Sequence, residues 1–251
     1  MRCVGSGGRA YYRQAHYTLA LISGWNWLAH MLVGHISSMS LNDAVVRVFA
    51  PDGPLVHVQA HFRPRAGQLA MAQAVAAAIQ AGTPLVVEAG TGVGKTFAYL
   101  VPALLSGERV LVSTATKALQ DQLHGRDLPL LLQALDLPAR TAVLKGRASY
   151  LCRHHLAQAR HDGEAPWGGR HGADLARIEL WAQATKTGDL AEVPNLDERS
   201  PVVARVTSTK ESCLGQGCPH FHQCHVYLAR REAQAADVVV INHHLFFADL
   251  E

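Results

Sequence analysis

The feature that most restricts the fold of this chain is a glycine-rich stretch, EAGTGVGKT at residues 88–96. It follows a short apolar run, Leu85–Val87, and precedes a segment of helical character. This is the order of strand, loop and helix that a phosphate-binding loop requires. Glycines let backbone N–H groups approach phosphate oxygens without interference from a Cβ atom, and the amino end of the helix favours the same anion. We therefore expect a buried parallel strand at residues 85–87 and a nucleotide phosphate site after it.

The last two residues of this loop carry the predicted chemistry. Lys95 would reach the β- and γ-phosphates of ATP, and the hydroxyl of Thr96 would bind Mg²⁺. Ala89 occupies the first position of the eight-residue signature, where glycine is usual, and its side chain is small enough for the turn. A chance glycine turn is the alternative, and the agreement of loop, strand and helix disfavours it. The predicted binding loop comprises Ala89, Gly90, Thr91, Gly92, Val93, Gly94, Lys95 and Thr96.

The rest of the chain alternates apolar strands with helices, which is typical of a doubly wound parallel sheet in an α/β fold. The length of 251 residues permits one large domain or one domain with an insertion. The net charge of +3 neither establishes nor excludes a nucleic-acid partner. The expected strands are 109–113, 140–144 and 236–241, and the expected helices are 40–50, 69–82, 96–105, 115–123 and 129–137.

Residues 1–38 differ in character from the remainder. An apolar run from Thr18 to Ile36 is interrupted by Asn26, His30 and His35, so we do not expect a membrane span. No clean small-residue cleavage site follows the early arginines, which argues against a signal peptide and for a cytoplasmic protein. We expect this atypical extension to be poorly structured or foreign to the natural chain, whose start would then be Met39.

A third region, residues 145–227, is richer in Gly, Pro, His and charge, with one expected helix at 173–187. It is too polar to supply a large core of its own, so a metal centre that joins its ends is physically sensible. Four cysteines lie in it, three of them with the spacing C-x4-C-x5-C and one sixty residues upstream. They are Cys152, Cys213, Cys218 and Cys224.

Four thiolates suit either Zn²⁺ or an iron–sulfur cluster. Zinc sites usually use tight C-x2-C pairs, which are absent here, and the longer loops suit a larger cluster better. His220, His222 and His225 are close enough in sequence to replace one cysteine in a zinc site. Cysteines that bind nothing are the remaining alternative.

Five stretches together resemble the DinG/YoaA branch of the XPD-like DNA helicases. These are superfamily 2 enzymes that carry a [4Fe–4S] cluster inserted in the first of two RecA-like domains. The resemblance runs from about Phe62 to the end of the sequence and is specific in its combination of motifs. The stretches are EAGTGVGKT (88–96), STATKALQDQL (113–123), LKGRASYLC (144–152), the three-cysteine cluster and ADVVVINHHLFFADL (236–250).

The resemblance implies ATP-driven 5′→3′ translocation on single-stranded DNA and unwinding of forked duplex DNA, typically in repair, with replication or repair proteins as further partners. It implies that Arg65 and Gln68 recognise adenine, although the residues alone leave Gln68 equally open to being an ordinary exposed glutamine. Residues 89–96 would be motif I, residues 113–123 would lie on the DNA path, and the four cysteines would hold the [4Fe–4S] cluster. His243 falls in a stretch typical of the family, with no chemical role assigned to it.

The resemblance also assigns the segments. Residues 39–144 would be the first part of the RecA-like ATP-binding domain, 145–227 the cluster insertion and 228–251 the return to that domain, ending before the DEAH box. Because that acidic motif is absent, we expect this chain to bind ATP and DNA but to hydrolyse ATP poorly. Single-strand contacts near the cluster would combine basic and aromatic side chains. The candidates are Arg147, Tyr150, Arg153 and Lys210, for each of which an ordinary solvated side chain is the alternative.

Two other classes of protein stay open at this point. One is a small P-loop ATPase or kinase that carries an unrelated zinc module. The other is a non-catalytic binding module that uses its cysteine centre for redox sensing or for contact with a partner.

Overall fold

The computed structural model of the chain describes residues 3–4, 17–22, 39–59, 62–161 and 170–248. It divides into two compact units, which are described separately. The first comprises residues 1–143 and 236–246, and the second comprises residues 144–235 and 247–251. No helix among the described residues is long and apolar enough to cross a membrane.

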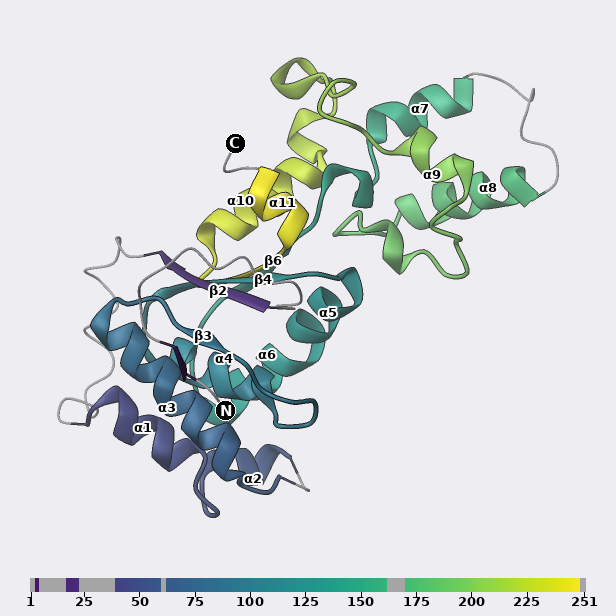
Figure 1. Ribbon diagram of the computed structural model, residues 1–251. Coiled ribbons are helices and arrows are strands. Elements are labelled where there is room, and N and C mark those ends of the chain that lie inside the picture. The colour runs from purple at the N-terminus through teal and green to yellow at the C-terminus, as the bar shows by residue number, and fades with distance from the viewer. Residues whose placement is uncertain (1–2, 5–16, 23–38, 60–61, 162–169, 249–251) are drawn as a thin grey trace. The chain divides into compact units, whose positions relative to one another are not determined.

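A four-stranded sheet with the order β2-β4-β6-β5 is the centre of the first unit (Figure 1). Strands β4 (Arg109–Thr114) and β6 (Val238–Asn242) pair in parallel, with Val112 opposite Val240. β2 (Tyr17–Ile22) lies antiparallel on the other side of β4, and β5 (Thr141–Leu144) follows β6 in the order. The buried valines of β4 and β6 fit the continuous apolar runs of strands that are covered on both faces. The expected α/β fold is therefore present.

The strand before the glycine loop differs from the expectation. β3 contains only Val86–Val87, pairs antiparallel with β1 (Cys3–Val4), and leaves Val86 57% exposed. The prediction of a buried parallel strand at this position is wrong, because one face of β3 is open to solvent whereas a buried parallel strand is covered on both faces. The apolar run predicted the strand but not the element that pairs with it.

Helices of the first unit begin and end where local signals place them. α1 (Leu41–Val48) is capped by Ser40, whose Oγ accepts from the amide of Asp43 at 3.1 Å. α3 (Ala66–Ala81) ends at Gly82, which adopts the left-handed conformation that glycine tolerates best. α3 packs against both α1 and α4 (Figure 1). The remaining helices are α2 (Pro54–Val58), α4 (Lys95–Leu105), α5 (Lys117–Gln122), the π-helical turn η2 (Leu123–Asp127), α6 (Leu128–Leu135) and α11 (His243–Ala248).

The core of the first unit lies between these helices and the sheet. α3 and α4 contribute small and branched apolar side chains that pack against the valines of β4 and β6. Burial of such side chains is the main favourable term in the stability of an α/β domain. The fully buried members include Ala72, Leu100, Val101, Leu123, Leu128, Leu131 and Val240.

The second unit is largely helical and has a core of its own. Ile178 and Val206 are fully buried within a cluster of nine apolar residues, so this unit has a core, although one smaller than that of the first unit. The apolar positions are spread thinly over several short helices, so no single stretch of sequence displays them. The helices are α7 (Arg153–His161), α8 (Arg170–Ala182), α9 (Pro201–Val206) and α10 (His225–Ala235), with 3-10 turns at η3 (Arg147–Ser149), η4 (Leu190–Glu192), η5 (Gly215–Gly217) and η6 (Phe221–Gln223).

Two boundaries bear on the expected organisation. The second unit begins at residue 144, next to the expected start of the insertion, and it includes the whole of α10, which extends past the expected end at 227. Of the expected extension at 1–38, only β1 and β2 are described, and the other residues lie outside the described part. The interpretation of this segment as an extension stays a prediction.

Candidate functional site

The first candidate site is the loop between β3 and α4, which has the backbone geometry of a phosphate-binding turn. Gly92 and Gly94 have φ values of 77° and 86°, a region that residues with a side chain rarely adopt. Gly94 is the N-cap of α4, so the first turn of that helix begins at Lys95 and Thr96. The free amides of a helix amino end attract anions. The loop therefore places its two predicted catalytic residues at the anion-attracting end of a helix of eleven residues.

Lys95 lies folded over this loop. Its Nζ donates hydrogen bonds to the carbonyl oxygens of Ala89 at 3.0 Å and Gly90 at 2.8 Å. Both contacts lie within six residues of sequence, so the loop itself determines where the ammonium group sits. The positive charge is consequently held beside the glycine loop instead of extending into solvent.

The two residues predicted to recognise adenine also contact the loop. Arg65, the N-cap of α3, donates through Nη1 to the carbonyl of Gly92, and Gln68 donates through Nε2 to the carbonyl of Gly94 at 2.9 Å. Gln68 is only 5% exposed, so the alternative of an ordinary exposed glutamine is wrong. The first turn of α3 is therefore hydrogen-bonded to the glycine loop through these two side chains. Adenine recognition by Arg65 and Gln68 stays a prediction.

The carboxyl ends of β4 and β6 form a second polar group in the same unit. Parallel neighbours end at the same edge of a sheet, which is where ligands of α/β proteins usually bind. Ser113 Oγ lies 2.6 Å from Nδ1 of His243, and Asn242 Nδ2 donates to the carbonyl of Ala115 at 3.4 Å. Thr116 caps α5 by accepting from the amide of Leu119 at 3.3 Å. The sequence assigned no role to His243, because its partner Ser113 is 130 residues away.

The second unit brings the four cysteines together. All four line one cavity of about 180 Å³, each is partly exposed, and none forms a disulfide. Two of them precede helices, since Cys152 comes directly before α7 and Cys224 directly before α10. The sequence-based prediction concerned all four cysteines, of which only the three downstream ones lie close together in sequence. The upstream one joins them through the fold of the unit.

The surroundings of the cavity shift the pKa of Cys152 and provide hydrogen-bond donors to the sulfur of Cys213. Burial raises the pKa of Cys152, and Cys218 and Cys224 raise it further through their negative charge, while backbone hydrogen bonds at residues 154 and 155 oppose this. Arg147 Nη1 lies 3.3 Å from Sγ of Cys213, which also accepts from the amide of Gly215 at 3.5 Å. The sulfur of Cys213 therefore has one positively charged donor and one amide donor directed at it.

The donor set of this cavity fits a thiolate-bound inorganic group. Four thiols share one cavity, and the positive side chain of Arg147 is available to offset their charge. His220 lines the same cavity, whereas His222 is exposed and His225 is buried outside it. Within the described residues, no three His, Cys, Asp or Glu side chains stand in metal-binding geometry. The cavity therefore supplies the ligand types that a thiolate-bound inorganic group requires.

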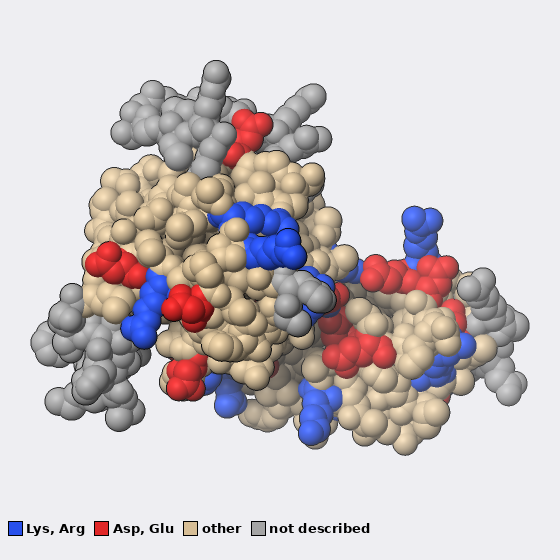
Figure 2. Space-filling view, turned by 90° about the horizontal axis from the view of Figure 1, so that it is seen from below, with Lys and Arg blue, Asp and Glu red and all other residues tan. Residues whose placement is uncertain are grey.

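The four residues expected to contact single-stranded DNA near the cysteines differ in availability. Tyr150 is 4% exposed, with its hydroxyl accepting from the amide of Lys145, so its proposed role as a stacking surface is wrong. Arg147 and Arg153 are half-buried and line the cavity, and Lys210 is exposed. On the face seen in Figure 2, basic side chains are interspersed with acidic ones, in keeping with the small net charge.

A glycine loop between a short strand and the amino end of a helix, within an α/β unit, is the arrangement that defines the P-loop class of proteins. Residues 70–157 match the DEAD/DEAH box helicase family. The chain is 48% identical over 213 residues to the "ATP-dependent DNA helicase YoaA" of Haemophilus influenzae, covering 84% of this chain and 33% of that protein. It is also 48% identical over 203 residues to the Escherichia coli protein of the same name, covering 80% and 32%.

A third relative is the "ATP-dependent helicase DinG" of Mycobacterium tuberculosis, 42% identical over 207 residues, with 74% of this chain and 31% of that protein covered. The chain belongs to the DinG/YoaA-type helicases of the DEAD/DEAH box class. It spans about one third of the length of the relatives it matches.

Proposed function

We propose that this chain provides the ATP-binding part of an ATP-dependent DNA helicase. The observation that supports this most directly is the glycine loop at the amino end of α4, with Lys95 lying over it and α3 bracing it. The relatives named above are ATP-dependent helicases, and they share this part of the sequence. The matching family is also a helicase family.

In the proposed mechanism, each residue of the loop has a separate task. Lys95 holds the β- and γ-phosphates of ATP, and the hydroxyl of Thr96 binds Mg²⁺. Glycine amides and the amino end of α4 stabilise the phosphate charge. Arg65 and Gln68, which already contact the loop carbonyls, hold the loop and adenine in a fixed relation.

DNA contacts are proposed at the carboxyl edge of the sheet, where residues 113–123 follow β4. In the full enzyme, alternating closure of two RecA-like domains would move the protein 5′→3′ along single-stranded DNA and open a forked duplex. Positive side chains along the path of a DNA strand contact its phosphates. They provide affinity for DNA that does not depend on the base sequence. Lys117 is exposed at the start of α5 and is the basic residue that best fits this role.

We also propose that Cys152, Cys213, Cys218 and Cys224 hold a [4Fe–4S] cluster. When bound, such a cluster supplies a rigid cross-link and a redox-active centre. The support for this is that four thiols share one cavity, with a hydrogen-bond donor from Arg147 at one of them. Iron and acid-labile sulfide in anaerobically purified protein would support the cluster, and zinc without sulfide would contradict it in favour of a zinc module.

Nucleotide binding is the test of the central proposal. Lys95→Ala should weaken binding of Mg²⁺-ATP about tenfold or more, because a charge-assisted contact to phosphate is worth roughly 1.5–3 kcal/mol. Arg47→Ala on the exposed face of α1 is the matched control and should bind as the unchanged chain does. Equal affinity of all three proteins would contradict the proposed site.

A further inference from the structure

One loop of the second unit contains no cysteine, yet it contacts the residues next to Cys152 and Cys224, the first and last of the four cysteines in sequence. We call residues 185–191 the Gly188 loop; it joins α8 to the turn η4. Gly188 is buried at its centre with a φ of 69°, the left-handed conformation that glycine tolerates best. Its neighbours are the residue that precedes Cys152 and the residue that follows Cys224.

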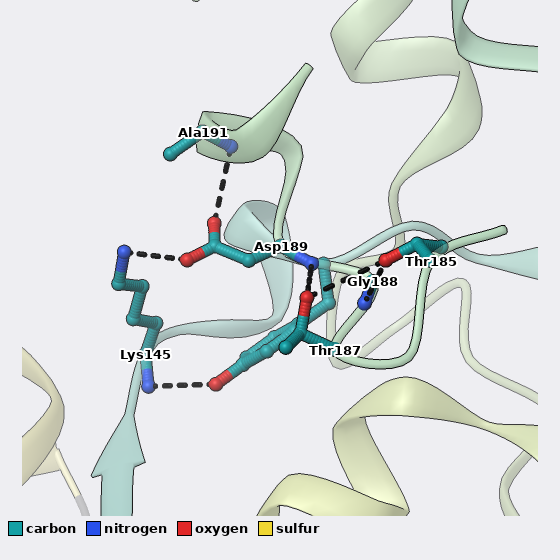
Figure 3. A network of polar contacts seen from close by, with 7 residues as sticks. Lys145, Thr185, Thr187, Gly188, Asp189 and Ala191 are labelled. Atoms are coloured by element: carbon teal, nitrogen blue, oxygen red, sulfur yellow. Dashed lines mark hydrogen bonds and ion pairs between the residues drawn. The ribbon is translucent and has the colours of Figure 1, made fainter. Parts of the chain in front are cut away.

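On the Cys152 side, the loop is joined to the chain by backbone and charge. The amide of Leu151 donates to the carbonyl of Gly188 at 2.8 Å, and Tyr150 forms a β-bridge with Asp189. Lys145 Nζ forms an ion pair with Oδ2 of Asp189 (Figure 3). The two atoms are 2.5 Å apart, and the Lys145 side chain is only 3% exposed. Removing one partner of a buried pair leaves an uncompensated charge, so the loop would be destabilised by the loss of either side chain.

On the Cys224 side, the contact is one of close packing. His225 is buried, and its ring lies so near Gly188 that an added Cβ would come within 2.1 Å of Cγ of the ring. Burial lowers the pKa of His225, and the nearby charge of Arg153 lowers it further. The absence of a side chain at Gly188 is therefore what allows the His225 ring to lie against the loop.

The loop is also rigid within itself. The hydroxyl of Thr185 accepts from the amide of Gly188 at 2.9 Å, and that of Thr187 accepts from the amide of Asp189 at 3.2 Å. The second carboxylate oxygen of Asp189 accepts from the amide of Ala191 at 3.1 Å (Figure 3). Side-chain oxygens that bond nearby amides hold a turn in one conformation.

We propose that the Gly188 loop is a positioning element that sets the spacing between Cys152 and Cys224, so that the four thiols can hold one cluster. This inference rests on the proposed iron–sulfur cluster. The reason is geometric: Cys152 arrives from a distant part of the sequence, and the loop is bonded next to it and packed next to Cys224. Residues outside the ligand set that orient ligands commonly change metal affinity by about ten- to a hundredfold when mutated.

The first experiment substitutes the glycine in the full chain. Gly188→Ala should release iron to a chelator about tenfold faster than the unchanged protein under anaerobic conditions, while its helical circular dichroism is retained. Gly107→Ala is the matched control, because Gly107 has a φ of 70° but open space around it. It carries a similar backbone cost and should keep the cluster. Iron release from Gly188→Ala at the unchanged rate would overturn the inference.

A second pair of variants decides the matter if Gly188→Ala fails to fold. His225→Ala removes the ring from Gly188 and should speed iron release. His225→Phe keeps a flat ring without nitrogen atoms and should retain the cluster, whereas loss of the cluster from both variants would overturn a packing role for the ring. Unchanged protein that never holds iron would instead refute the cluster proposal itself, so the two failures can be told apart.

Discussion

Ser113 Oγ and His243 Nδ1 lie 2.6 Å apart and join the carboxyl ends of two neighbouring parallel strands. Ser113 is fully buried near the end of β4, and His243 follows β6 directly. The register of the two strands pairs Thr114 with Asn242, which brings the residues that follow each strand to the same edge of the sheet. Asn242 adds a bond to the loop after β4. This contact ties the proposed DNA-contact segment to the segment that follows β6.

Ser113→Ala removes the hydroxyl from this contact. We expect the free energy of unfolding to fall by about 0.5–1.5 kcal/mol, because the side-chain hydrogen bond between Ser113 and the partly buried His243 is lost. Urea unfolding followed by circular dichroism measures this change. His243→Asn keeps a polar atom near the Nδ1 position, so its free energy of unfolding should fall less than that of His243→Leu. His244→Ala, at the exposed neighbouring position, is the control and should leave the free energy of unfolding nearly unchanged. Equal stability of Ser113→Ala and the unchanged chain would contradict the prediction.

Gly94→Ala should disrupt the nucleotide loop. Its φ of 86° and a Cβ only 2.2 Å from Nε2 of Gln68 would strain the backbone by about 1–3 kcal/mol and displace the glutamine. We expect ATP affinity to fall sharply, as measured by isothermal titration calorimetry. Gly82→Ala, with a φ of 61° and open space, carries a comparable backbone strain away from the loop and should leave ATP affinity unchanged. A loss of affinity in both variants would point to a general loss of stability.

Lys145→Met should destabilise the second unit by about 3–5 kcal/mol, because it leaves Asp189 largely buried without its partner. The double variant Lys145→Met with Asp189→Leu should recover part of the loss, since replacing both charges by apolar side chains is often nearly neutral. A double-mutant cycle in urea gives the coupling energy. Coupling near zero would show that this pair does not hold the Gly188 loop.

Ile178→Ala tests whether the second unit has a core of its own. Ile178 is fully buried on α8, so the truncation should lower the free energy of unfolding by about 2–5 kcal/mol. Leu180→Ala on the same helix is the matched control, because Leu180 is 72% exposed and should contribute little. Thermal unfolding that is the same for both variants would contradict the assignment of this core.

Much of the first unit followed from local signals. The Ser40 cap, the Gly82 stop and the valine runs of β4 and β6 each act through residues a few positions apart, and the helices and strands lie where these signals place them. The glycine loop could be located for the same reason. The pairing of β3 could not, because a short apolar run does not state which strand lies beside it.

Contacts between residues distant in sequence were visible only in the folded chain. Local chemistry in the sequence determined the phosphate loop, its Lys95 and Thr96, and the presence of four thiols within one polar region. Tertiary structure decided that Gln68 is buried against Gly94, that Tyr150 is buried and hydrogen-bonded, and that Gly188 lies between the segments of Cys152 and Cys224. The physical reason is that backbone propensities and turn chemistry act over a few residues, whereas packing and buried ion pairs depend on which segments meet in space.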